Sequence, residues 1–290
     1  MAVFVVAACS AGSSPSSTPP ATSTLADTTA PPTTIAATTV PPATDPPTTV
    51  PAGTTTAPTT TAAATTTTTA DVSMAGMVVV IDPGHNGKNA EHPDEINRLV
   101  DIGNGTKACN TTGTQADDGY PEAAFNWALA LATRDALEEL GATVVMTRRD
   151  NDGWGPCIDQ RAAIGNEAGA DAVISIHADG GPATGRGFHV IHPAPIPGLT
   201  DDIAGESRAL AEALLLAFPG SGMPVADYVG SDGLSERSDL GGLNLSDVPA
   251  VFLEVGNMKN ASDIALLEDE GFRSKAAGAI TAALVDFLTG

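Results

Sequence analysis

Basic residues are scarce in this chain of 290 residues, and none of its 13 Lys and Arg residues occurs before Lys88. Because Asp and Glu number 35, the formal net charge is -22, which disfavours binding to nucleic acid or to anionic lipid. Aromatic residues make up only 4% of the sequence, so the core must be built from Ala, Val, Ile and Leu. We expect the acidic surface to keep the protein soluble.

Cysteine is also rare, and Cys9, Cys109 and Cys157 show no CxxC or other zinc-type spacing. A GxSxG motif is absent, which argues against a serine nucleophile. The apolar run 2–8 is too short to cross a bilayer. It ends in Val6-Ala7-Ala8-Cys9, which resembles a bacterial lipobox although no basic residue precedes it. We therefore expect an exported protein of the cell envelope, lipid-anchored at Cys9 to the outer face of the membrane or otherwise secreted.

Composition divides the chain into a tail and a folded part. After the signal-like or lipobox-like segment 1–9, residues 10–76 are dominated by Thr, Pro, Ala and Ser, which predicts a disordered linker. Residues 77–290 are expected to form the folded domain. In an exported protein, Cys109 and Cys157 are a natural disulfide pair, and the alternative is two unrelated buried thiols.

Strand and helix patterns alternate through the folded part. Strands are expected at about 78–81, 142–147, 171–176, 187–191 and 249–253. Helices are expected at about 120–140, 158–168, 202–217, 262–268 and 272–288. Two long irregular stretches remain, at 86–119 and 219–240. The alternation predicts an α/β fold with a largely parallel sheet and helices on both faces.

Imidazole and carboxylate side chains occur where strands end. His85 follows the first strand after a Pro-Gly turn, His177 follows the third, and Glu254 ends the last. Glu122 begins the helix after the first long loop, where the helix dipole alone would also favour an acid. Parallel strand ends share one edge, so the four can converge. Two His and one carboxylate with an open position form a catalytic zinc set, and a further carboxylate can act as general base.

With these motifs, the chain from about residue 77 to the C-terminus resembles the zinc-dependent N-acetylmuramoyl-L-alanine amidases of bacterial cell walls, the Amidase_3 group. The segments that carry the resemblance are Val80-Ile81-Asp82-Pro83-Gly84-His85-Asn86-Gly87, Glu122 with Asn126, Ser175-Ile176-His177-Ala178-Asp179, and Glu254-Val255-Gly256-Asn257 with Asn260. The nearest branch is secreted, single-domain and disulfide-containing. Many members have Gly-Phe where this chain has Gly256-Asn257.

The resemblance implies that His85, Glu122 and His177 bind Zn2+ and that Glu254 is the catalytic base. It supports the disulfide between Cys109 and Cys157, and it implies a three-layer αβα sandwich of the phosphorylase/hydrolase-like kind. The implied substrate is peptidoglycan, cut between N-acetylmuramic acid and L-alanine, and we expect a monomer.

Several readings stay open. The chain could instead be another zinc hydrolase, such as a peptidoglycan carboxypeptidase, or a non-catalytic wall-binding module, although such a module should have lost ligands. Asp82 is either a partner of a ligand histidine or a turn former. Arg186 and Arg237 either meet carboxylates of the substrate's peptide or, as we favour, pair with acidic residues of the surface. The remaining histidines match no motif and are expected to be structural or exposed: His92, His189 and His192.

Overall fold

The structure, a computed structural model, describes residues 72–230 and 232–290. Cys9, the segment 1–9 and the linker up to residue 71 lie outside the described residues, so what the sequence predicts for them stays a prediction. The folded segment already includes Met74, which is fully buried and whose N–H donates to the carbonyl of Leu140 at 2.8 Å. No helix in the described part is both long and apolar enough to cross a membrane.

A six-stranded sheet forms the middle of this unit, in the order β4-β1-β5-β8-β6-β7. Its strands are β1 (Val78–Pro83), β4 (Thr143–Met146), β5 (Ala172–Asp179), β6 (His189–Pro193), β7 (Leu234–Arg237) and β8 (Ala250–Asn257). The first four strands in this order run parallel, β6 is antiparallel to β8, and β7 is parallel to β6. The prediction of a mostly parallel sheet is confirmed.

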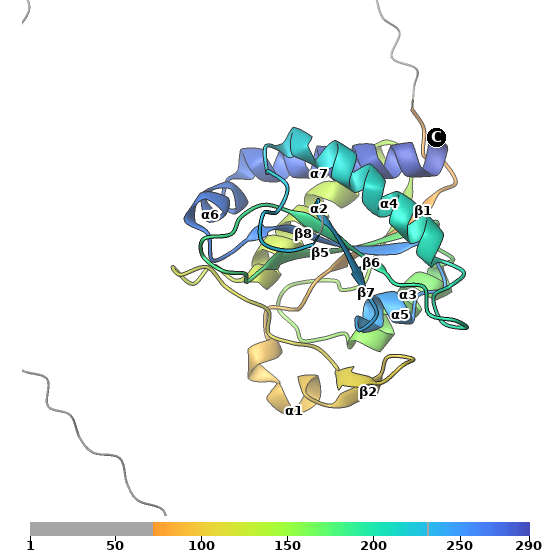
Figure 1. Ribbon diagram of the computed structural model, residues 1–290, viewed down its shortest axis with the longest axis horizontal. Helices are drawn as coiled ribbons and strands as arrows, with labels where there is room; N and C mark the ends of the chain where they lie inside the picture. Colours follow the sequence, from red (N-terminus) through yellow and green to blue (C-terminus); the bar gives the residue numbers. More distant parts are fainter. Residues whose placement is uncertain (1–71, 231) are drawn as a thin grey trace, which may run out of the picture. The chain divides into compact units, whose positions relative to one another are not determined.

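Helices cover both faces of the sheet (Figure 1). On one face lie α2 (Glu122–Glu139), α4 (Ala204–Ala217) and α7 (Glu270–Thr289), and on the other lie α3 (Ile158–Ala168) and the short α5 (Gly241–Asn244). Successive residues of β1 point to opposite faces of the sheet. Val79 packs in the core on the side of α2, α4 and α7, and Val80 packs in the core on the side of α3 and α5. The predicted αβα sandwich is therefore confirmed. The short α6 (Ala261–Leu267) packs against β8 and α7.

The two stretches expected to be irregular hold small elements. Within 86–119 lie η1 (Asn89–Glu91), α1 (Pro93–Ile96) and an antiparallel hairpin of β2 (Leu99–Asp101) and β3 (Thr106–Ala108). Within 219–240 lie the end of η2 (Phe218–Ser221) and the edge strand β7. These elements are three or four residues long, too short for a periodic apolar pattern, so tertiary contacts decide their structure.

Candidate active site

The three predicted metal-binding side chains meet at the carboxyl edge of the sheet. His85 follows β1, His177 lies near the end of β5, and Glu122 is the first residue of α2. Glu122 Oε1 lies 3.1 Å from His85 Nε2 and 2.9 Å from His177 Nδ1. One ligand atom from each side chain falls within 4.8 Å of the others. The side chains of all three are largely buried.

Main-chain donors orient the carboxylate of Glu122. Its Oε2 accepts a hydrogen bond from the N–H of Thr114 at 2.8 Å, and its Oε1 accepts a longer one, 3.3 Å, from the N–H of Ala178. Burial alone would raise the pKa of Glu122, but the two imidazoles hold it well below its usual value. The carboxylate is therefore ionised and aimed at the histidines.

The ring of His85 is held from the side opposite to Glu122. Its Nδ1 lies 3.1 Å from the carbonyl oxygen of Thr111, which also accepts a hydrogen bond from Asn89 at 2.7 Å. An Nδ1–H that donates to a carbonyl leaves Nε2 as the ligand atom, as is usual for a metal-binding histidine. Of the two alternatives left open for Asp82, direct partnership with a ligand histidine is not found, because Asp82 forms no hydrogen bond with a histidine among the described residues. Thr111 is the partner of His85 instead.

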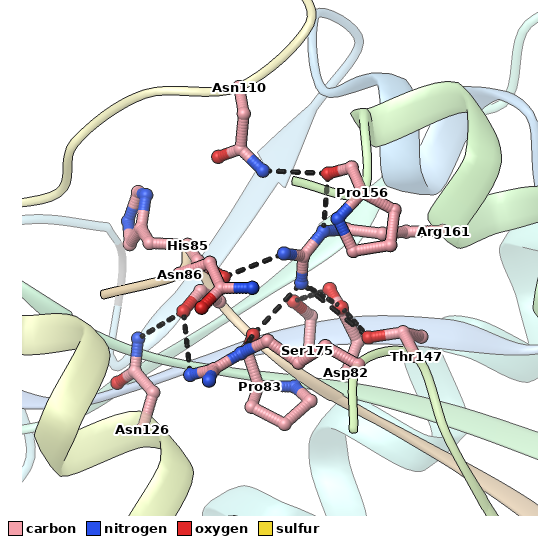
Figure 2. A network of polar contacts seen from close by, with 12 residues as sticks. Asp82, Pro83, His85, Asn86, Asn110, Asn126, Thr147, Pro156, Arg161 and Ser175 are labelled. Carbon is pink, nitrogen blue, oxygen red and sulfur yellow. Dashed lines mark hydrogen bonds and ion pairs between the residues drawn. The ribbon is translucent and has the colours of Figure 1, made fainter. Parts of the chain in front are cut away.

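Buried guanidinium groups fix the backbone around His85, which has φ 60 in the left-handed region. Figure 2 shows the Arg161 guanidinium between Asp82 and the backbone of Pro83 and His85. Its Nη1 donates to the carbonyl of Pro83 at 2.9 Å and its Nη2 to that of His85 at 2.6 Å. Arg148 donates to the same Pro83 carbonyl at 2.8 Å. These bonds support a turn that an L-residue rarely adopts.

Asp82 is the counter-charge of this network. It accepts hydrogen bonds from Thr147, Ser175 and Arg161. Burial would raise the pKa of Asp82, but the nearby Arg161 and the two hydroxyl donors lower it to about 2. Burial lowers the pKa of Arg148 to about 9, and the like charge of Arg161 adds to this. Asp82 therefore acts on His85 through Arg161 and the backbone.

Gly84 lets the two histidines approach each other. A Cβ at this position would lie 2.2 Å from Cε1 of His177, far inside van der Waals contact. The ring of His177 therefore passes directly over the backbone of Gly84. On its other side it stacks on Phe252, with ring centroids 5.1 Å apart.

Glu254 lies on β8 in register with His177 on β5. Burial raises the pKa of Glu254 well above its usual value, and the carboxylates of Glu122 and Asp179 add to this effect. Its Oε2 is a buried atom that forms no hydrogen bond with any of the residues that the structure describes. A cavity of about 500 Å³ is lined by Glu254 and by all three of the clustered side chains. An unpartnered carboxylate at a cavity wall is well placed to accept a proton.

The structure also gives the contacts of the cysteines, arginines and other histidines singled out in the sequence. Cys109 and Cys157 form a disulfide, as the sequence resemblance implied. Arg186 pairs with the buried Asp263, and Arg237 pairs with Asp239, although Arg237 also lines the cavity. His189 and His192 are buried, and His92 stacks on Trp154.

Some residues of the site were missed from the sequence. Thr111 and Thr114 act mainly through backbone groups, which leave no signal in residue type. Arg161 sits in a helix pattern that indicated nothing beyond a helix, and its role follows from burial beside Asp82. Lys107 lies in the hairpin that was expected to be a loop.

Comparison with known proteins decides the family. Residues 79–286 match the family model Amidase_3, described as N-acetylmuramoyl-L-alanine amidase. The chain belongs to this family. It is 46% identical over 217 residues to the N-acetylmuramoyl-L-alanine amidase Rv3717 of Mycobacterium tuberculosis, covering 74% of this chain and 88% of that protein.

Solved amidase structures agree with this assignment. The crystal structure of the amidase Ami1 from Mycobacterium smegmatis is 45% identical, with a TM-score of 0.71, and the match covers 75% of this chain and 99% of that one. The apo form of Ami1 from Mycobacterium abscessus is 46% identical, with a TM-score of 0.70, over 74% of this chain and all of that one. The predicted function, a peptidoglycan hydrolase of the N-acetylmuramoyl-L-alanine amidase type, is confirmed at this level, and such an enzyme acts on the cell envelope.

Proposed function

We propose that this amidase uses a zinc ion held by His85, Glu122 and His177, with Glu254 as general base. The observation that carries the proposal is the meeting of these side chains around one point at the sheet edge, with all three ligand atoms within 4.8 Å of one another. Two ring nitrogens and one carboxylate oxygen are the donor set of a catalytic zinc site with an open position. The residues present therefore fit the metal.

In the reaction, the amide between the lactyl group of N-acetylmuramic acid and L-alanine is hydrolysed. When bound, zinc supplies Lewis-acid chemistry, because it polarises a carbonyl oxygen and makes water more acidic. Glu254 takes a proton from the water that attacks the amide carbon and returns it to the nitrogen of the departing L-alanine. Thr114 and Thr111 orient Glu122 and His85 before substrate binds, which preorganises the site.

The proposal extends to where and how the enzyme works. Cys9 would carry a lipid anchor, and the Thr/Pro-rich linker that follows it, up to about residue 71, would let the catalytic domain reach the wall as an exported monomer. An extended linker of this length spans on the order of 190 Å at about 3.1 Å per residue. Metabolic labelling with a fatty acid, compared between the full chain and Cys9→Ser, tests the anchor.

Digestion of purified peptidoglycan by the full chain, with zinc and with a chelator, tests the reaction. Mass spectrometry should find whole stem peptides released from intact sugars, and the chelator should abolish their release. Release of terminal D-alanine alone would instead indicate a carboxypeptidase.

Two variants separate the base from the ligands. Glu254→Gln should keep zinc and lower kcat by about 10³-fold, because a positioned general base contributes this order of rate enhancement. The exposed Glu206→Gln on α4 is the matched control and should change neither quantity. His177→Ala should lose zinc in elemental analysis, while His92→Ala should retain it. A fully active Glu254→Gln variant would refute the assignment of the base.

A further inference from the structure

The cavity that contains the zinc site has a second, basic wall. Lys107 of β3 and Arg237 at the end of β7 both line it. They share one carboxylate, because Asp239 accepts from Lys107 Nζ at 2.7 Å and from Arg237 Nε and Nη2 at 2.6 and 2.8 Å. Asp239 is not among the residues that line the cavity. Two cations therefore face the cavity, and within the described residues Asp239 is the one carboxylate hydrogen-bonded to them.

Both cations keep donors that Asp239 does not use. Nη1 of Arg237 forms no hydrogen bond within the described residues, and Lys107 Nζ uses one of its three protons on Asp239. Their side chains are 39% and 41% exposed, so a ligand can reach them. Asp239 holds both in place before a ligand arrives, which lowers the entropy cost of binding.

Charge is arranged asymmetrically along this cavity. The other charged residues of the lining, apart from the histidines, are carboxylates and one arginine already paired with a carboxylate: Asp82, Glu122, Asp179, Glu254 and Arg161. In a chain of net charge -22, the Lys107–Arg237 pair is the part of this wall that suits an anion. Both residues of the pair line the same cavity as Glu254, and Arg237 is close enough to oppose the effect of burial on the pKa of Glu254.

The chemistry of the substrate says which anion can arrive there. Its N-acetylated sugars are uncharged, and the lactyl carboxyl group is consumed in the bond that is cut. The anionic groups that remain are the free carboxylates of the peptide. We propose that Lys107 and Arg237 bind a carboxylate of this peptide and so select substrates that carry one, an inference that rests on the proposed function. In this arrangement the peptide lies along the basic wall, and the sugar lies away from that wall.

Two probes that differ only in their carboxylates test the inference. L-Alanyl-D-glutamic acid has free α- and γ-carboxylates, and its α,γ-diamide has a carboxamide in place of each. Binding of each to the zinc-loaded full chain is measured by NMR titration, and kcat/KM is measured for the corresponding N-acetylmuramoyl peptides. We expect the carboxylate form to be favoured about tenfold in both measurements, as for loss of one charge-assisted hydrogen bond.

Arg237→Gln and Lys107→Gln should each bring this ratio towards one by weakening the carboxylate probe alone. The exposed Lys275→Gln on α7 is the control and should leave the ratio unchanged. Equal binding of the two probes by the wild type, or a preference that survives in both variants, overturns the inference while hydrolysis continues to support the proposed function. Preferential binding without any hydrolysis supports the inference and refutes the proposed function.

Discussion

The site around His85 and the basic wall of the cavity, formed by Lys107 of β3 and Arg237 of β7, are held in different ways. At the strand ends, His85 is fixed by a buried network in which Asp82 and Arg161 are almost fully inaccessible to water. Along the wall, Lys107 and Asp239 form an ion pair that is 39% and 47% exposed, and a disulfide ties the hairpin segment to the start of α3.

This difference separates two tasks. Groups that hold a metal need positions that do not shift, which buried hydrogen bonds from rigid strands provide. Groups that recognise a variable part of a substrate can sit on short elements whose stability comes from a crosslink and partly solvated charges. The same comparison predicts how unequal the effects of mutations in the two regions will be.

Asp82→Asn should have the largest effect on stability. It leaves Arg161 buried without its carboxylate, which typically costs about 3–5 kcal/mol. The free energy of unfolding, measured in denaturant at pH 7, should fall by that amount, while the exposed Asp247→Asn should be neutral. A loss below about 1 kcal/mol would mean that the network at the strand ends is no stronger than a surface ion pair.

Removing the disulfide with Cys109→Ser and Cys157→Ser should lower the free energy of unfolding by about 2–4 kcal/mol. Since the Thr111 carbonyl that orients His85 lies two residues beyond Cys109, zinc affinity should also fall by about tenfold. Chelator competition measures the affinity. Leu210→Ala, in the buried core on α4, should lower stability comparably without changing zinc affinity. Unchanged zinc affinity in the cysteine variant would show that the disulfide does not influence the metal site.

The pH dependence of stability at low pH should report the contribution of Asp82 to the buried network. The pKa of Asp82 is lowered to about 2 in the folded protein, so its contribution to stability is present above its unfolded pKa of about 4 and is lost as pH falls from 4 to 2. The contribution is about 2 kcal/mol. Between pH 4 and pH 2, the free energy of unfolding should depend less steeply on pH for Asp82→Asn than for the wild type or Asp247→Asn. Equal pH dependence in all three proteins would show that Asp82 is not the responsible group.

Asp239→Asn should have the smallest effect on stability, below about 1 kcal/mol, because its partners are partly solvated. Thermal and denaturant unfolding should therefore resemble those of the wild type. A loss near that of Asp82→Asn would erase the contrast between the two regions.

What could be predicted from the sequence follows the same division. The positions of His85, His177 and Glu254 followed from apolar runs that end in a polar residue, because parallel strands place their carboxyl ends at one edge. The hairpin that carries Lys107, and β7 with Arg237, are too short to show a periodic pattern. Arg237 was expected to pair with a surface acid, and it does pair with Asp239, but its place on the cavity wall depended on the fold. Thr111 supports His85 through its carbonyl oxygen and also through its hydroxyl group, 3.2 Å from His85 Nδ1. A single threonine in a long loop gave no sign of this role in the sequence.

The absent side chain of Gly84 sets a limit on how this enzyme can vary. With the His177 ring pressed against the backbone there, even the single methyl group of alanine has nowhere to go. Ligand residues can in principle be exchanged for others with similar donors, but this position admits no alternative to hydrogen. A strict constraint on sequence change in the active site therefore falls on a residue that performs no chemistry.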